Sequence, residues 1–158
     1  MGMDLVNQHD NCIQFRHVEW ARILYLAEDH GWQPAGTLSR YDHDDPSSEF
    51  YCPEPWDGGY ASNDGQMVTS NDAYAFADAL ERACERIPDE RILSGEHVKV
   101  ENLPASINDP VVNLLVRIGC VDTVPREFLN VYEFFSGEGK TAMEELIAFC
   151  RQGEFYLF

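Results

Sequence analysis

The stretch from Asn63 to Ile87 reads NDGQMVTSNDAYAFADALERACERI and contains the clearest helix pattern in the chain. Apolar side chains recur at steps of three and four between residues 73 and 87, so they share one face of a helix with about 3.6 residues per turn. Ser70 is the expected N-cap, because its hydroxyl can accept a hydrogen bond from a free backbone N–H, and Pro88 ends the helix. The pattern therefore predicts a helix over residues 70–87.

The residues before this helix predict a turn followed by an extended run. Asn63-Asp64-Gly65 indicates a turn, because Gly adopts positive φ freely and Asn and Asp tolerate it better than most residues. Residues 66–69 then form a short apolar and polar run that is typical of a strand. A strand, a cap and an amphipathic helix in this order favour a domain that mixes sheet and helix.

The patterns on either side predict one α+β domain over residues 1–158, mainly helical, with about five helices and a small sheet of short strands. Residues 1–11 are polar and are expected to be poorly ordered. Further helices are expected over residues 18–30, 110–118, 125–135 and 141–152, with Val18 in the core and the helix at 110–118 largely buried. Asn108 or Asp109 is the expected N-cap of the helix at 110–118, with Pro110 as its first residue. Further strands are expected over residues 12–15, 96–100 and 155–158.

The chain is strongly acidic, with 11 Lys and Arg against 28 Asp and Glu and a formal net charge of −17. Its charges are unevenly spread, because neither Lys nor Arg occurs between Arg40 and Arg82. Such a field repels phosphate backbones, so nucleic-acid binding is disfavoured, and it attracts cations or a basic protein surface. A surface that serves solubility alone is the competing interpretation. The carboxylates in this interval are Asp42, Asp44, Asp45, Glu49, Glu54, Asp57, Asp64, Asp72, Asp78 and Glu81.

Residues 38–60 form the least regular part of the sequence and are expected to be a long surface loop. The segment contains YDHDD, the prolines of CPEPW and the pair Gly58-Gly59, which are typical of turns and loops. Loops of this length are uncommon in compact domains unless they have a function. Aromatic side chains argue against simple disorder here. The expected partner-binding residues are Asp42, Asp44, Asp45, Glu49, Tyr51, Glu54, Trp56 and Asp57.

Two runs partly match motifs for phosphate or metal binding, but both lack the residue spacing that the full motif requires. The run GEGKT at residues 137–141 ends like a phosphate-binding loop, but Phe134 stands where the motif needs its first Gly. An interhelical loop is the expected structure there. The run DHDD at residues 42–45 offers oxygen ligands without the spacing of a calcium-binding loop. The sequence therefore predicts no catalytic residue, no metal ligand and no cofactor.

The cysteines and the hydropathy profile favour the cytoplasm. Five cysteines are scattered, odd in number and without a CxxC pair, which suits a reduced compartment better than a disulfide framework. The first residues lack the basic and apolar regions of a secretory signal, and no apolar run approaches the ~20 residues that span a bilayer. No membrane contact is expected.

Three stretches together resemble a group of small bacterial cytosolic proteins to which no activity is attached. They are WARILYLAEDHGWQPAGT at Trp20–Thr37, NDGQMV with DAYAFADAL at Asn63–Leu80, and IAFCRQGEF at Ile147–Phe155. The resemblance rests on helix stripes, glycine caps and turns. It implies a bacterial cytosolic domain and carries over no activity and no catalytic residue.

Three functions remain open from the sequence. The first is a non-enzymatic interaction protein that binds a basic partner through residues 41–60, with an immunity-type inhibitor of a cationic toxin as its most concrete form. The second is a small-molecule-binding protein or an enzyme of unknown reaction, with a pocket between the turn at Asn63–Gln66 and the helices. The third is a scaffold that acts through self-association.

Overall fold

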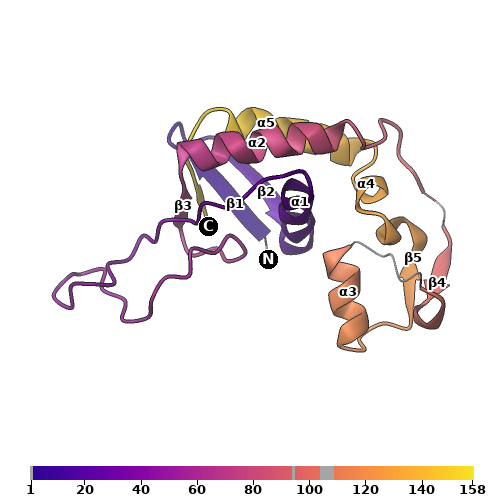
Figure 1. The fold of residues 1–158 in the computed structure, drawn as a ribbon, viewed down its shortest axis with the longest axis horizontal. Coiled ribbons are helices and arrows are strands. Elements are labelled where there is room, and N and C mark those ends of the chain that lie inside the picture. Colours follow the sequence, from indigo (N-terminus) through magenta and orange to yellow (C-terminus); the bar gives the residue numbers. More distant parts are fainter. Residues whose placement is uncertain (1, 94, 104–108) are drawn as a thin grey trace.

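The computed structural model describes residues 2–93, 95–103 and 109–158 and has an α+β fold, as the sequence predicts (Figure 1). The main sheet has the strand order β2-β1-β6-β3 and is antiparallel throughout. Its strands are β1 (Gly2–Asn7), β2 (Cys12–Arg16), β3 (Gln66–Val68) and β6 (Phe155–Leu157). A second, two-stranded sheet pairs β4 (His97–Lys99) with β5 (Thr123–Pro125). The α-helices are α1 (His17–Asp29), α2 (Ser70–Cys84), α3 (Pro110–Arg117), α4 (Val131–Phe134) and α5 (Glu138–Cys150).

The start of the chain is a central strand, so the expectation of a poorly ordered segment over residues 1–11 is wrong for most of it. Met3, Leu5 and Asn7 are buried while the residues between them are half-buried. This alternation is the period of a strand with one face in the core. Strand β1 pairs with β2 on one side and with β6 on the other, which places it inside the sheet.

Helices α2 and α5 lie side by side over one face of the main sheet (Figure 1). The apolar stripe predicted for α2 is buried there, with Phe76 at 2% and Leu80 at 0% exposure. Leu146 and Phe149 of α5 and Phe155 of β6 complete this part of the core. Each such side chain contributes about 1.5–3 kcal/mol by leaving water, so this layer is the main source of stability.

Three local expectations, on an N-cap, a core residue and a loop, are corrected by the structure. The N-cap of α2 is Thr69, whose side chain accepts from Asp72 N, while Ser70 Oγ accepts from Glu154 N at 3.1 Å. Val18 of α1 is 44% exposed and does not belong to the core, whereas Trp20 is buried. The GEGKT run is not an interhelical loop, since Glu138–Cys150 is helical.

The helix expected over residues 125–135 is two elements, a 3-10 turn η2 (Arg126–Leu129) and the short α4. Asn130 separates them, because its backbone is extended and its side chain caps Tyr132 N at 3.0 Å. Helix α3 was expected to be largely buried, but Leu114 and Ile118 are 52% and 57% exposed. Only the first turn of α3 packs firmly. An apolar stripe in the sequence predicts which face of a helix is apolar, but it does not show whether another element of the fold covers that face.

A buried ion pair joins α3 to α1. Arg22 Nε donates to Asp109 Oδ2 at 2.6 Å, and the two side chains are 3% and 0% exposed. The other carboxylate oxygen of Asp109 accepts from Val111 N and Val112 N, each at 3.0 Å, and so caps α3. The Arg22 guanidinium also lies 4.0 Å from the ring centre of Phe134. Asp109 is one of the two caps that the sequence offered for this helix; the other, Asn108, lies outside the described residues.

Within the described ranges, no helix is both long and apolar enough to cross a membrane.

Candidate functional site

Residues 38–60, here called the acidic loop, project away from the sheet and helices as an extended excursion (Figure 1). The structure describes all of these residues and places neither a helix nor a strand among them. The two arms meet at a narrow neck. Thr37 N donates to Gly58 O at 3.0 Å and Thr37 Oγ1 donates to Gly59 O at 2.8 Å. Leu38 exchanges two backbone hydrogen bonds with Met67 of β3, which ties the neck to the sheet.

A buried carboxylate anchors this neck to α2. Asp72, in the first turn of α2 and 3% exposed, accepts hydrogen bonds from Trp32 Nε1 at 2.9 Å and from the Tyr60 hydroxyl. The Tyr60 oxygen in turn accepts from Gly36 N at 2.9 Å. The Trp32 ring packs edge-on against Tyr60. The positive end of the helix dipole favours an ionised carboxylate at this position. The arrangement fixes both ends of the acidic loop against the core.

The environment of Tyr60 favours its neutral form. Burial, and then the Asp72 carboxylate that accepts its hydrogen bond, raise the pKa of Tyr60 well above its ordinary value. Since phenols in an unfolded chain lose their proton near pH ~10, the folded protein binds the extra proton above that pH. The free energy of unfolding therefore falls as pH rises above about 10.

This pH dependence is expected to be measurable in the Tyr60→Phe variant. Between about pH 8 and about pH 10.5, wild-type protein should lose more stability than Tyr60→Phe, because the variant has no phenol to ionise at this position. Urea unfolding at the two pH values measures the difference. Equal losses in the two proteins would show that Tyr60 does not supply the effect. Below pH ~8 the phenol is protonated in both the folded and the unfolded chain, so this group is not expected to make stability vary with pH there.

Hydrogen bonds inside the acidic loop hold it in one shape. Asp42 Oδ1 accepts from Asp44 N and Asp45 N, each at 3.0 Å, which is the geometry of an Asx turn. His43 spans the two arms, with Nδ1 3.0 Å from Cys52 O and Nε2 2.8 Å from Ser39 Oγ. Because a carbonyl only accepts, Nδ1 donates to Cys52 O. The loop is thus internally braced and not a loose tether.

The tip and flanks of the loop present charge together with aromatic surface. Asp44, Asp45, Glu49, Glu54 and Asp57 are all exposed. Two hydrogen bonds from Ser47 lower the pKa of the Asp45 carboxyl, so it stays ionised at neutral pH. Phe50 and Tyr51 lie in the same region and are 62% and 37% exposed.

The residues predicted to bind a partner thus fall into two groups. The carboxylates other than Asp42 point their charge at solvent, and Tyr51 lies among them. Trp56 is half-buried, and its Nε1 donates to Thr37 O at 2.9 Å, so it closes the neck. Phe50 was not among the predicted site residues, although it is the more exposed of the two neighbouring aromatic side chains. Its position in an aromatic-bearing acidic segment was the only sequence signal for it.

A second polar cluster joins the ends of α1 and α2 to α4. The Tyr132 hydroxyl lies 3.0 Å from Asp29 Oδ2, 3.0 Å from Arg86 Nη1 and 2.8 Å from His30 Nε2. The Tyr132 hydroxyl can donate only one hydrogen bond, and it donates it to the Asp29 carboxylate. Arg86 and His30 therefore donate to the Tyr132 oxygen. Burial and the Asp29 carboxylate raise the pKa of Tyr132. These hydrogen bonds connect three helices, which indicates a structural role for the cluster.

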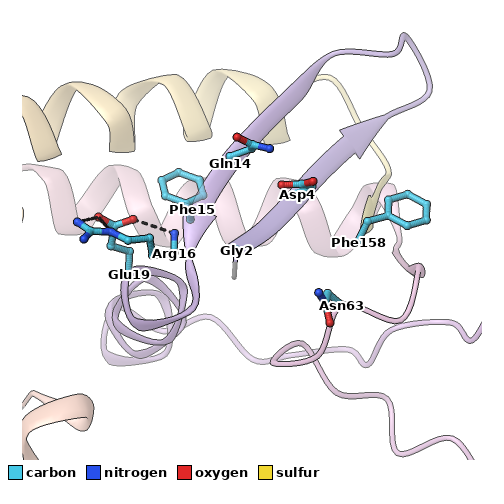
Figure 2. Close-up of a pocket in the computed structure, with 8 residues that line it drawn as sticks. All are labelled: Gly2, Asp4, Gln14, Phe15, Arg16, Glu19, Asn63 and Phe158. Carbon is cyan, nitrogen blue, oxygen red and sulfur yellow. Dashed lines mark hydrogen bonds and ion pairs between the residues drawn. The ribbon is translucent and has the colours of Figure 1, made fainter.

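A groove of about 500 Å³ lies on the face of the main sheet opposite α2 and α5 (Figure 2). Asp4, Gln14 and Asn63 line it together with the ring of Phe158. The sequence placed a pocket between the Asn63–Gln66 turn and the helices; this groove borders Asn63 but is formed mainly by strands. Gln66 itself is fully buried and bonds back to Ser62 O at 2.6 Å.

Among the residues that the structure describes, no three His, Cys, Asp or Glu side chains converge on a point that could hold a metal ion. Comparisons with protein-family models, with curated proteins and with solved structures find no match.

Proposed function

We propose that this chain is a non-enzymatic interaction protein whose acidic loop binds a basic protein partner. The observation that carries the proposal is the combination found in that loop: exposed carboxylates and the exposed rings of Phe50 and Tyr51 belong to the same segment, and hydrogen bonds within the segment hold its shape before binding. Preformed surfaces bind with a smaller loss of conformational entropy than flexible ones. An immunity-type inhibitor of a cationic toxin is the most concrete form of this function.

Charge and aromatic surface would have different roles in such a complex. The carboxylates raise the rate of encounter with a cationic surface, and they disfavour partners that carry negative charge. Aromatic side chains that become fully buried supply much of the affinity in protein interfaces. Phe50 and Tyr51 are placed for that role, because their neighbours Glu49 and Glu54 would form the charged rim around them.

The test is a pull-down from a bacterial lysate at low salt, followed by elution in a salt gradient and mass identification. The wild-type protein is compared with a loop-neutral variant, Asp44→Asn, Asp45→Asn, Glu49→Gln and Glu54→Gln. The matched control removes the same charge from exposed carboxylates on the helices, by Glu28→Gln, Glu85→Gln, Glu144→Gln and Glu145→Gln.

We expect one basic protein to be retained by the wild type and by the control and released at elevated salt. The loop-neutral variant is expected to bind it about tenfold or more weakly, because several interfacial charge pairs are lost together. If the loop-neutral variant and the control retain the same protein equally well, net charge and not the acidic loop is responsible, and the proposal fails.

A small-molecule-binding role is the alternative, and the groove in Figure 2 is the observation that favours it. Its polar groups are Asp4, Gln14 and Asn63, so a polar ligand would fit it better than an apolar one. Thermal-shift screening of polar metabolites tests this role, with Asn63→Ala as the variant that should lose any shift.

A further inference from the structure

Strand β2 has a backbone edge that faces away from the sheet. Asp4 of β1 exchanges hydrogen bonds with Phe158, each at 2.8 Å, so its N–H and C=O point toward β6. In antiparallel strands successive residues point their backbone groups to opposite sides. Met3 and Leu5 therefore bond to their partners Phe15 and Ile13.

The remaining β2 residues, Cys12, Gln14 and Arg16, direct their N–H groups away from β1. Arg16 shows this directly, since its N–H donates to Glu19 Oε2 at 2.9 Å and not to a strand. A carboxylate oxygen thus already occupies one position at which the carbonyl of an added strand would lie. Over the described ranges, no hydrogen bond from the protein reaches the corresponding groups of Cys12 or Gln14.

The two edges of the main sheet differ in this respect. At the β3 edge, Leu38 pairs with Met67 through hydrogen bonds of 2.9 and 2.8 Å, so that edge is covered. Strand β2 reads CIQFR and contains neither proline nor lysine, the residues that commonly protect an edge from pairing. An uncovered edge of this kind is a template for an extended chain.

A groove of about 720 Å³ runs beside this edge, between β2 and the segment from η2 to the start of α5. Gln14 and Arg16 line one side, and the rings of Phe128 and Phe134 line the other. This size is typical of sites that enclose a ligand. It offers a peptide backbone hydrogen bonds on one side and its alternate side chains aromatic surface on the other.

The overall charge of the chain favours a basic occupant at this edge. Arg16 is neutralised by Glu19 at 2.9 Å, and Arg91 uses its Nη1 on the carbonyl oxygens of Phe134 and Ser136. Arg91 keeps its positive charge and is matched in number by the exposed Glu138, so the groove itself has no net charge and the preference for a basic occupant comes from the net charge of −17 on the whole chain. A second copy of the chain would bring another net charge of −17 to this edge, which opposes pairing.

We propose that an extended, lysine- or arginine-bearing segment of a protein partner adds to the free edge of β2 as a fifth strand and packs an apolar side chain against the rings of Phe128 and Phe134, which contact each other edge-on. The surface lies at the edge of the sheet opposite to the acidic loop, given the strand order β2-β1-β6-β3. The proposal stands independently of the function assigned to that loop.

The probe is a short synthetic peptide of alternating lysine and valine, acetylated and amidated at its ends. Amide hydrogen exchange is followed by NMR with and without the peptide. We expect the amides of Cys12 and Gln14 to exchange at least about tenfold more slowly when it is bound. The amides of Ile13 and Phe15 already bond to β1, so they should change little. Slowing of all four amides alike, or of none, would overturn the proposal.

Two matched comparisons separate strand addition from attraction by charge alone. A peptide of the same sequence, N-methylated at alternate residues, keeps its charge but loses donors and should bind about tenfold or more weakly. In the protein, Gln14→Pro removes the outward N–H without removing a bond to β1, whereas Gln14→Ala keeps it. We expect Gln14→Ala to bind the peptide and Gln14→Pro not to, with both variants showing a cooperative thermal transition.

Equal binding of the two peptides, or of the two variants, would contradict strand addition. Protection of the Gln14 amide that rises with protein concentration and without peptide would identify a second copy as the occupant and would also overturn it. The loop-neutral variant keeps β2 intact, so it should bind the peptide; failure of the loop proposal and failure of this one can therefore be told apart.

Discussion

Replacing Asp109 with alanine is expected to lower the free energy of unfolding by about 3–5 kcal/mol, because it leaves the Arg22 guanidinium buried without its counter-charge. The pair is only 2.6 Å long and both side chains are almost fully enclosed. Alanine also removes the cap from α3, since Asp109 accepts from Val111 N and Val112 N. Urea unfolding of the wild type and the variant measures the loss.

Two further variants show which part of Asp109 matters. Asp109→Asn can still cap α3 but has no charge, so its loss reports the ion pair. Replacing both partners, by Arg22→Met with Asp109→Leu, should recover much of the loss in stability, because apolar residues of similar volume often stabilise the fold as well as a buried ion pair does.

Arg126→Gln is the exposed control, because its salt bridge joins side chains that are 60% and 65% exposed. Such exposed pairs contribute about 0–1 kcal/mol. A loss below about 1 kcal/mol in Asp109→Ala would show that the pair is not buried as described.

Replacing Asp72 with alanine is expected to cost about 2–6 kcal/mol, because two buried donors, Trp32 Nε1–H and the Tyr60 hydroxyl, lose their acceptor together and each unsatisfied group costs about 1–3 kcal/mol. Asp72→Asn, which keeps one acceptor oxygen, should lose less. The neck of the acidic loop should also loosen, because Tyr60 and Gly36 are held through the same carboxylate.

Limited proteolysis checks the second part of this expectation. Asp72→Ala should be cut within residues 38–60 faster than the wild type at equal concentrations of protease, since opening of the neck exposes the backbone. Asp78→Asn is the control, because Asp78 lies on the same helix but bonds at the surface to Arg151. Equal cleavage of the loop in all three proteins would show that Asp72 does not fix it.

The sequence predicted the elements whose patterns are local. The apolar stripe of α2, the terminal strand and the cap at Asp109 all depend on residues within a few positions of one another. Strand β1 was missed although Met3 and Leu5 alternate with Gly2 and Asp4. That alternation is too short to stand out from a polar terminus, and the strand depends on pairing with β6 at the other end of the chain.

The contacts that organise the candidate site join residues far apart in sequence. From the sequence, Asp72 was only one of the carboxylates between Arg40 and Arg82, since Trp32 lies 40 residues away and no periodicity connects them. The Arg22–Asp109 pair spans 87 residues and could not be inferred from spacing. Trp56 and Phe50 belong to the same aromatic-bearing segment, and only the fold shows that the first closes the neck while the second faces solvent.

The most direct test of the acidic loop as a preformed binding surface is the association rate constant with the retained basic partner, measured over a range of ionic strength. For the wild type and the helix-charge control, this rate should fall steeply as salt increases, because opposite charges steer the encounter. The loop-neutral variant should associate about tenfold or more slowly at low salt and show little salt dependence. If all three proteins show the same rate and the same salt dependence, the partner binds elsewhere and the account of the acidic loop is wrong.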